Sequence, residues 1–463
     1  MKKIKLICLL LTAAALFSLF CPCVLAENEA VTEPFRVEAK AALLVDLNND
    51  RIIYELHPDE RIYPASLTKI MSCLVVLENG NLSDTVTIPE SAYNDIDSSS
   101  STAGLMVGEQ LTLEQLLYCM MIVSGNEACN TAAEHIAGSV TDFVRMMNER
   151  AYELGCEDTH FCNPHGLHDP DHYTTARDLM RITQAALKSE TFKQIVNTAE
   201  YTLPATNLSE ERTLKTTNQL ILNSTGNAFY YSRASGIKTG YTSQAGRCVI
   251  STAKKDGISL LAIVCGAATT VAESGEVRME SFPQCIRLFQ YGFDHFEYVT
   301  ALSPLYPVTQ IRVENSAGSE FVALAPKDEI RVLLPIGYDE KKLVKTITPN
   351  PGPVEAPIAA GDCYGTAEVR YEDELIGVTE LTAIADVARS EFSAAASETS
   401  AYIQQNWWKW IVVFILVLIA AFLLLLILIA IRRRKSRIRQ IREHRRNVEQ
   451  DKAYRDYDWG DEP

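Results

Sequence analysis

Residues 63–80 read YPASLTKIMSCLVVLENG and place a serine and a lysine three positions apart at the start of an apolar run. The residues that follow Lys69 are mostly apolar, which predicts a helix buried in the core. A charged amine is rarely buried without a partner or a chemical task. If the helix begins at Ser66, the hydroxyl and the amine share one face and can touch.

This serine–lysine pair can carry chemistry. A serine hydroxyl is a weak nucleophile unless a base lies beside it. A buried lysine can act as that base, because burial and nearby positive charge both lower its pKa. Many helices contain this spacing by chance, so the pair needs support from other parts of the chain.

Two short motifs supply that support. The tripeptide Ser124-Gly125-Asn126 lies between two apolar helical runs, where a glycine turn can direct a hydroxyl and an amide toward a cleft. Taken alone, it is more typical of a capped link between helices. The tripeptide Lys238-Thr239-Gly240 precedes a pair of predicted strands, and taken alone it indicates a turn with an exposed lysine. The motifs follow one another at separations of 58 and 114 residues.

Together the three motifs are the signature of penicillin-binding proteins and class A β-lactamases. The sequence resembles the low-molecular-mass penicillin-binding proteins, which are serine-type D-alanyl-D-alanine carboxypeptidases of cell-wall metabolism. The resemblance covers residues 35 to about 385 and includes NPHGLHDPDHYTTARDL at 163–179. It implies a transpeptidase-like α/β domain, a β-rich C-terminal domain and a C-terminal membrane anchor.

The resemblance also implies roles for individual residues. Ser66 is the acyl-ester nucleophile and Lys69 its proton acceptor. Ser124 passes the proton to the leaving D-alanine, and Asn126 holds the substrate amide.

The remaining expected roles belong to the third motif. Lys238 and Thr239 bind the terminal carboxylate, and a cation beside a hydroxyl suits that group. Lys238 also helps to keep Lys69 neutral. Gly240 lets the substrate backbone lie against the strand, and the N–H of Thr242 joins that of Ser66 in the oxyanion hole.

The sequence departs from related patterns in two places. It has no E-x-x-x-N loop between the second and third motifs, so the glutamate that activates a deacylating water in class A β-lactamases is not expected. Arg278 is the candidate for an additional arginine that assists carboxylate binding, but its spacing from the following Tyr-Gly-Phe is irregular. His165 and His168 can be given catalytic roles, although a structural role in the loop is favoured because a lysine already serves as the base.

Both ends of the chain indicate export and membrane anchoring. Residues 1–26 combine three lysines, an apolar stretch and a small-residue ending, which is typical of a secretory signal peptide. A lipoprotein anchor at Cys21 is the alternative, but Phe20 is bulkier than the residue such sites carry. Residues 410–431 contain no charge over 22 positions and are long enough to span a bilayer.

The basic run that follows the span sets the expected topology. The positive-inside rule places residues 432–463 in the cytoplasm and residues 27 to about 406 outside, as a single-pass protein of the cell membrane. The basic run can alternatively be a site for lipids or a partner. Residues 27–408 carry a net charge of about −24, which argues against binding to nucleic acid.

Cysteines and histidines give no sign of a metal site. Nine of the 12 cysteines follow the signal peptide, and their scattered spacing does not indicate a disulfide framework. Only Cys156 and Cys162 are close enough in sequence to suggest a bridge. No ligand spacing typical of zinc is present, so we expect neither a metal nor another cofactor.

The exported part is long enough for two domains. Strands are predicted at both ends of the first domain, with helical patterns between them, which favours one antiparallel sheet beside a helical cluster. Short β-type runs then predict a small all-β domain. The expected organisation is a signal peptide (1–26), a transpeptidase-like α/β (α+β) domain (35–295), a β-rich domain (296–385), a stalk (386–409), a transmembrane helix (410–431) and a basic cytoplasmic tail (432–463).

The predicted function is removal of the terminal D-alanine from peptidoglycan stem pentapeptides through an acyl-Ser66 intermediate, with covalent binding of β-lactam antibiotics. A membrane-anchored β-lactam sensor and a β-lactamase are the alternatives. The tail has no recognisable signalling domain, which counts against the sensor. A catalytically idle cell-wall binding protein is a further alternative, and the complete set of three motifs argues against it.

Overall fold

The structure is a computed structural model that describes residues 35–271 and 277–455. The predicted signal peptide lies outside these residues. The described chain forms two compact units. The first reaches Val299 and also includes Val332–Tyr338, and the second comprises Thr300–Arg331 and the chain from Asp339 onward.

A five-stranded antiparallel sheet forms the centre of the first unit. Its strand order is β2-β1-β9-β8-β7, so strands from the two ends of this part of the chain lie side by side. The prediction of one sheet assembled from both ends is confirmed. The strands are β1 (Ala41–Asp46), β2 (Arg51–Leu56), β7 (Ala234–Thr242), β8 (Gly246–Lys255) and β9 (Ile258–Ala267).

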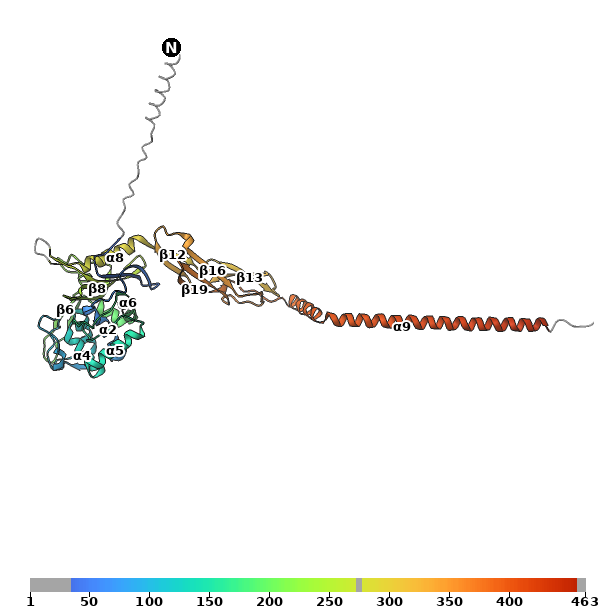
Figure 1. Cartoon of the computed structure of the whole chain (residues 1–463), viewed down its shortest axis with the longest axis horizontal. Coiled ribbons are helices and arrows are strands. Elements are labelled where there is room, and N and C mark those ends of the chain that lie inside the picture. Colours follow the sequence, from blue (N-terminus) through green and yellow to red (C-terminus); the bar gives the residue numbers. More distant parts are fainter. Residues whose placement is uncertain (1–34, 272–276, 456–463) are drawn as a thin grey trace, which may run out of the picture. The chain divides into compact units, whose positions relative to one another are not determined.

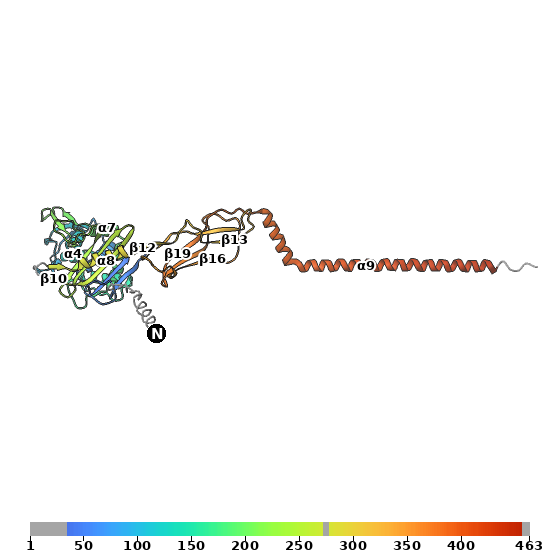
Figure 2. The ribbon, with the colours of Figure 1, turned by 90° about the horizontal axis from the view of Figure 1, so that it is seen from above.

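Helices cover both faces of this sheet. Leu43 and Val45 of β1 pack into the core of the helical cluster, whereas Ala42 and Leu44 pack against α8 on the opposite face. Because β1 is covered on both faces, all six of its residues are buried, and its first five residues are all apolar instead of alternating. Figure 1 shows the sheet with α8 on one side and the cluster containing α2, α4, α5 and α6 on the other, and Figure 2 shows the same chain from above.

The helical patterns in the sequence, at residues 67–77, 113–123, 127–137, 140–154 and 176–187, all form helices, with boundaries shifted by one or two residues. They are α2 (Thr68–Asn79), α3 (Leu113–Ile122), α4 (Asn126–Ala137), α5 (Val140–Glu153) and α6 (Ala176–Ala186), followed by α7 (Glu190–Val196) and α8 (Ser281–His295). Short strands form three small pairs: β3 (Thr85–Thr87) with β4 (Gln110–Thr112), β5 (Glu200–Leu203) with β6 (Arg212–Lys215), and β10 (Thr269–Val271) with β11 (Val277–Met279).

The second unit contains a six-stranded sheet of order β16-β18-β19-β14-β13-β17. Its buried side chains form a core of their own, centred on Leu324, Val369 and Leu381. The predicted β-rich C-terminal domain is therefore confirmed as a fold. The strands in this part of the chain are β12 (Phe296–Leu302), β13 (Thr309–Glu314), β14 (Phe321–Pro326), β15 (Ile330–Pro335), β16 (Leu343–Pro349), β17 (Val354–Glu355), β18 (Cys363–Tyr371) and β19 (Glu374–Ala383).

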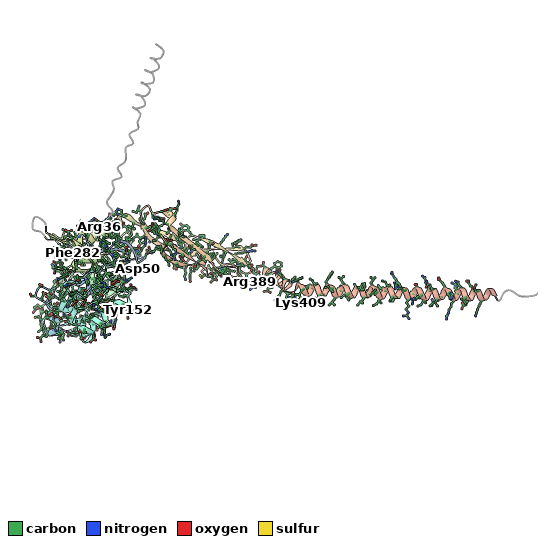
Figure 3. The ribbon with its side chains drawn as sticks, in the orientation of Figure 1. Arg36, Asp50, Tyr152, Phe282, Arg389 and Lys409 are labelled. Atoms are coloured by element: carbon green, nitrogen blue, oxygen red, sulfur yellow. The ribbon has the colours of Figure 1, made fainter. Side chains whose placement is uncertain are left out.

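One long helix, α9 (Glu391–Arg455), includes most of the predicted stalk, the predicted span and part of the tail. It is long and apolar enough to cross a membrane, and its most apolar window has a mean hydropathy of 3.7. The apolar side chains beyond Lys409 project outward from the helix (Figure 3). A membrane anchor explains why so many apolar side chains are exposed.

Candidate active site

The turn that carries Ser66 precedes α2. Residues Ala65–Leu67 form a 3₁₀ turn, and α2 begins at Thr68, so Ser66 lies just outside the α-helix in which it was expected. The amine of Lys69 still reaches the Ser66 hydroxyl, with Nζ and Oγ 3.1 Å apart. The predicted contact between nucleophile and base is therefore present.

The amine of Lys69 is fully buried and its contacts suit a neutral base. It donates to Asn126 Oδ1 and to the backbone carbonyl of His165, both at 2.7 Å. The contact with Ser66 Oγ is the third, so a charged amine can donate to all three oxygens. When the amine is neutral, its two N–H groups go to Asn126 and His165, whose oxygens can only accept, and its lone pair faces the Ser66 hydroxyl proton. Burial lowers the pKa of Lys69, while the nearby Cys129 and Glu127 act in the opposite direction.

Lys238 of β7 is a second buried amine, with 1% of its surface exposed. Burial lowers its pKa well below the usual value, and repulsion from Lys69 lowers it further. Its Nζ donates to the carbonyl of Thr239 at 3.1 Å. The charge of Lys69 therefore disfavours the charged form of Lys238, and in the described part of the chain neither amine is bonded to a carboxylate.

Ser124 lies between α3 and α4 in a left-handed conformation, with φ of +63°. Its hydroxyl is buried and has no hydrogen-bond partner among the described residues. Such strain and an unsatisfied hydroxyl are typical of functional sites. The Ser124 hydroxyl is thus available to a group that enters the cleft.

These residues surround one cleft of about 920 Å³. Ser66, Ser124 and Asn126 line it together with residues of β7, namely Thr239, Gly240 and Thr242. Lys69 and Lys238 lie behind this lining, buried under it.

Strand β7 runs close to the nucleophile. A Cβ added at Gly240 would lie 3.1 Å from the backbone nitrogen of Ser66, so a larger residue would disturb the turn. Two further residues of the cleft were not predicted from the sequence. The hydroxyl of Thr217 lies 2.7 Å from that of Thr239. Arg247 lines the cleft, and its guanidinium stacks over the Tyr241 ring with 4.0 Å between the guanidinium carbon and the ring centroid. Neither residue belongs to a motif that singles it out.

Two histidines of the loop between α5 and α6 contact residues next to Ser66. His165 is buried, which lowers its pKa to about 3, and its carbonyl is an acceptor for Lys69. His172 was not singled out from the sequence. Its Nε2 lies 2.8 Å from Thr68 Oγ1, and its Nδ1 accepts the N–H of Cys162 at 3.1 Å. The N–H of this neutral ring is therefore on Nε2 and donates to Thr68, next to the Ser66 turn.

The structure leaves one expectation open and corrects another. The backbone of Arg278 lies in β11 opposite Thr270, but its side chain is outside the described part of the structure, so its role stays a prediction. The suggested Cys156–Cys162 bridge is absent, because both thiols are free. The Cys156 sulfur is buried against the carbonyl of Asp178, and the Cys162 sulfur lies 3.6 Å from His160 Nδ1.

A comparison with known families decides the class of protein. The family model described as D-alanyl-D-alanine carboxypeptidase matches residues 27–269. The chain belongs to the D-alanyl-D-alanine carboxypeptidase family. The model of the C-terminal domain of penicillin-binding protein 5 matches residues 296–389 of the same chain. This carboxypeptidase therefore has both domains of the low-molecular-mass penicillin-binding proteins.

Individual relatives agree with this assignment. D-alanyl-D-alanine carboxypeptidase DacF of Bacillus subtilis is 30% identical over 81% of this chain and 92% of its own length. DacC of Escherichia coli is 29% identical over 83% of this chain and 92% of its own. Among solved structures, penicillin-binding protein 5 of Haemophilus influenzae is 29% identical, with a TM-score of 0.58 over 77% of this chain and 99% of its own.

Proposed function

We propose that this serine-type carboxypeptidase removes the terminal D-alanine from peptidoglycan stem pentapeptides at the outer face of the cell membrane, through an acyl ester on Ser66. The observation that carries this proposal is the contact of a buried, hydrogen-bonded Lys69 amine with Ser66 Oγ at the floor of the cleft. The family assignment supplies the reaction class, and the residue roles are inferred from the geometry.

In the acylation step, Ser66 Oγ attacks the carbonyl carbon of the D-alanyl-D-alanine bond and its proton passes to Lys69 Nζ. The backbone N–H of Ser66, with that of Thr242, stabilises the oxyanion. Lys69 hands its new proton to Ser124, whose hydroxyl has no partner among the described residues, and Ser124 gives its own proton to the leaving nitrogen. The C–N bond breaks, free D-alanine departs, and Lys69 is neutral again. The acyl ester remains on Ser66.

In the deacylation step, water attacks the ester carbonyl and Lys69 accepts its proton. The C–O bond to Ser66 breaks, the proton returns to Oγ, and the shortened peptide leaves. Asn126 orients the substrate amide on one side of the cleft. Thr239 and Lys238 hold the terminal carboxylate on the other side, although Lys238 must act from behind the cleft lining.

The membrane topology belongs to the same proposal. The apolar part of α9 anchors the chain, and the basic residues from Arg432 onward remain in the cytoplasm. The cleft is then outside, where peptidoglycan is built.

Release of D-alanine from diacetyl-lysyl-D-alanyl-D-alanine tests the function. The wild-type enzyme should release it, whereas Ser66→Ala should not. Intact-mass spectrometry after brief exposure to penicillin should show one long-lived adduct on the peptide that contains Ser66. Rapid repeated hydrolysis of penicillin would favour a β-lactamase, and acylation without D-alanine release would favour a sensor.

A further inference from the structure

Glu127 is a buried carboxylate that the reaction above does not use. It follows Asn126 in α4 and its side chain is fully buried. Its Oε1 accepts the backbone N–H of Ala103 at 2.6 Å and that of Leu105 at 3.4 Å. Its Oε2 has no partner among the described residues. A carboxylate buried in this way is costly, so its position calls for a physical explanation.

The segment that Glu127 binds continues into one wall of the cleft. Ser99, Ser100 and Ser101 line the cleft opposite β7. Residues 101–106 contain no helix or strand and depend on other contacts for their position. The carbonyl of Ser101 accepts the N–H of Asn126 at 2.9 Å, and the next contacts along the segment are the two bonds to Glu127. The wall is therefore attached to the same end of α4 that presents Asn126 to Lys69.

Glu127 also interacts with Lys69 through its charge. A negative charge on Glu127 favours the charged form of Lys69, so it raises the pKa of the amine against the effect of burial. Burial raises the pKa of Glu127 above its usual value, although its backbone hydrogen bonds and Lys69 act in the opposite direction. The other titratable groups that face this pair from the surrounding elements are Tyr93, Cys119, Cys129, His165 and Lys238.

We propose that Glu127 is a positioning residue for acylation, which fixes the 101–105 wall against α4 and places a carboxylate next to Asn126, the residue that bonds to Lys69. This inference rests on the proposed carboxypeptidase function. It assigns two separable tasks to one side chain. The length of the side chain allows it to bond to the 101–105 wall, and its charge acts on Lys69.

Two conservative variants separate the two tasks. Glu127→Asp keeps the charge but is one methylene shorter, so it should lose the bonds to the wall. Glu127→Gln keeps the length and one acceptor oxygen but removes the charge. Glu134→Asp and Glu134→Gln are matched controls, because Glu134 lies on the same helix and bonds only to the Ser91 hydroxyl.

The full-length variants are compared by three measurements: amide hydrogen exchange of residues 101–105, the rate of Ser66 acylation by a fluorescent penicillin, and the pH profile of that rate. Glu127→Asp should lose protection at Ala103 and Leu105 and acylate about ten-fold more slowly, because small displacements of catalytic groups reduce rates strongly. Glu127→Gln should keep the protection but shift the acid limb of the profile to lower pH, since Lys69 then loses its proton more easily. The Glu134 controls should do neither.

The proposal is overturned if Glu127→Asp keeps both the protection and the acylation rate. Its electrostatic part is overturned if Glu127→Gln leaves the acid limb unchanged. If Glu127→Asp does not fold, Glu127→Gln decides, because loss of protection or an unshifted limb in that variant contradicts the proposal. Failure of the wild-type enzyme to acylate or to release D-alanine would instead refute the proposed function, so the two failures are distinguishable.

Discussion

The chemistry of Ser66 depends on a few buried groups whose charge is set by their surroundings. Burial favours the neutral form of an amine, and repulsion from Lys69 further lowers the pKa of the buried Lys238. In its neutral form Lys69 can direct its two N–H groups to Asn126 and His165 and its lone pair to the Ser66 hydroxyl. A lysine at this position can therefore serve as a base near neutral pH.

Replacement of this base should abolish acylation. In Lys69→Arg the guanidinium cannot lose its proton, so we expect the acylation rate to fall by about 10²- to 10⁴-fold. Lys254→Arg, an exposed lysine of β8, is the control and should acylate normally. Stopped-flow measurement of penicillin acylation compares the variants, and a near wild-type rate in Lys69→Arg would exclude Lys69 as the base.

Gly166 allows the histidine loop to pack against the nucleophile turn. Its φ is +86°, and an added Cβ would lie 1.9 Å from the carbonyl oxygen of Ala65. Gly166→Ala should therefore displace the Ser66 turn and reduce acylation as well as stability. Gly138→Ala is the matched control, because φ is +78° there but no atom lies within 4 Å of the added Cβ. It should cost only about 1–2 kcal/mol of stability and leave acylation intact.

The buried histidines should make the first unit sensitive to acid. Burial lowers the pKa of His165 to about 3 and that of His172 to about 4, whereas an unfolded chain titrates near 6.5. The unfolded state then binds more protons between pH 6.5 and about 4, so stability should fall as the pH decreases through this window. The slope is at most about 1.4 kcal/mol per pH unit for each histidine. Thermal unfolding across this range should show a shallower slope for His172→Gln, and an unchanged slope would contradict this assignment.

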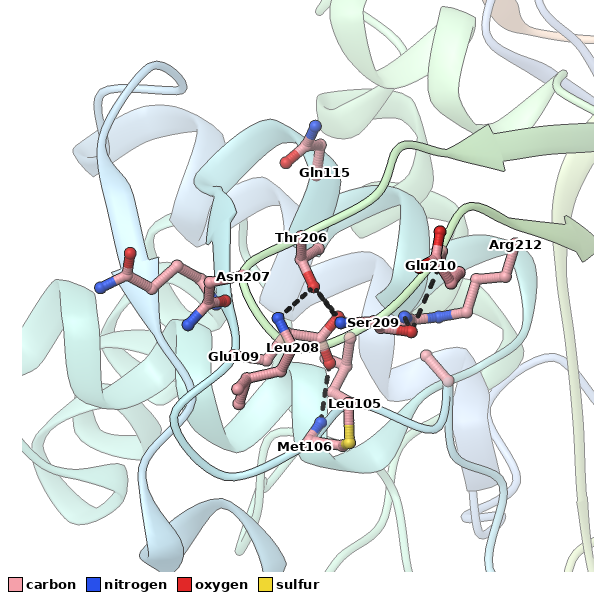
Figure 4. A network of polar contacts seen from close by, with 12 residues as sticks. Leu105, Met106, Glu109, Gln115, Thr206, Asn207, Leu208, Ser209, Glu210 and Arg212 are labelled. Atoms are coloured by element: carbon pink, nitrogen blue, oxygen red, sulfur yellow. Dashed lines mark hydrogen bonds and ion pairs between the residues drawn. The ribbon is translucent and has the colours of Figure 1, made fainter.

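At the scale of elements, polar side chains connect segments that secondary structure leaves separate. Glu109 precedes β4, and Arg212 begins β6. Glu109 is fully buried and accepts from Arg212 Nη2 and Thr206 Oγ1, both at 2.9 Å, and from the backbone N–H of Met106 at 2.8 Å. Figure 4 shows how this network joins the loop before β6 to the segment before β4.

Removal of one partner from this ion pair should destabilise the first unit strongly. Arg212→Met leaves the Glu109 carboxylate buried without its cation, which costs about 3–5 kcal/mol in comparable cases. Arg145→Met is the control, because Arg145 pairs with Glu149 in a largely exposed pair, and such pairs contribute little to stability. Denaturant unfolding measures both changes. Equal losses of unfolding free energy in the two variants would show that burial does not increase the contribution of the Glu109–Arg212 pair to stability.

For the whole molecule, catalysis and anchoring reside in different parts of the chain. The cleft lies entirely within the first unit, while the candidate span lies in α9 of the second. No described cleft residue belongs to α9, so tethering does not require the helix to contribute to the chemistry.

Truncation should separate these two properties. A chain of residues 27–400 lacks the span and should be soluble without detergent, whereas the full chain should partition into membranes. D-alanine release and penicillin acylation should match those of the full chain in detergent. Loss of catalysis in a folded, soluble truncated protein would show that the anchor does more than tether.

The sequence alone determined the class of the fold, the order of its parts and the three motifs. Hydrophobic periodicity is local, so it reveals α2 to α6, and an uncharged run of 22 residues reveals a span without tertiary information. The three motifs indicate the reaction class through their resemblance to those of the penicillin-binding proteins.

Only the tertiary structure decided the surroundings of these motifs. Glu127, His172, Thr217 and Arg247 belong to ordinary local sequences, and contacts between distant segments give them their place at the site. The burial of Lys238, the 3₁₀ turn at Ser66 and the absence of a Cys156–Cys162 bridge likewise follow from packing. Charge state and side-chain direction depend on solvent exclusion and three-dimensional neighbours, and a linear pattern specifies neither.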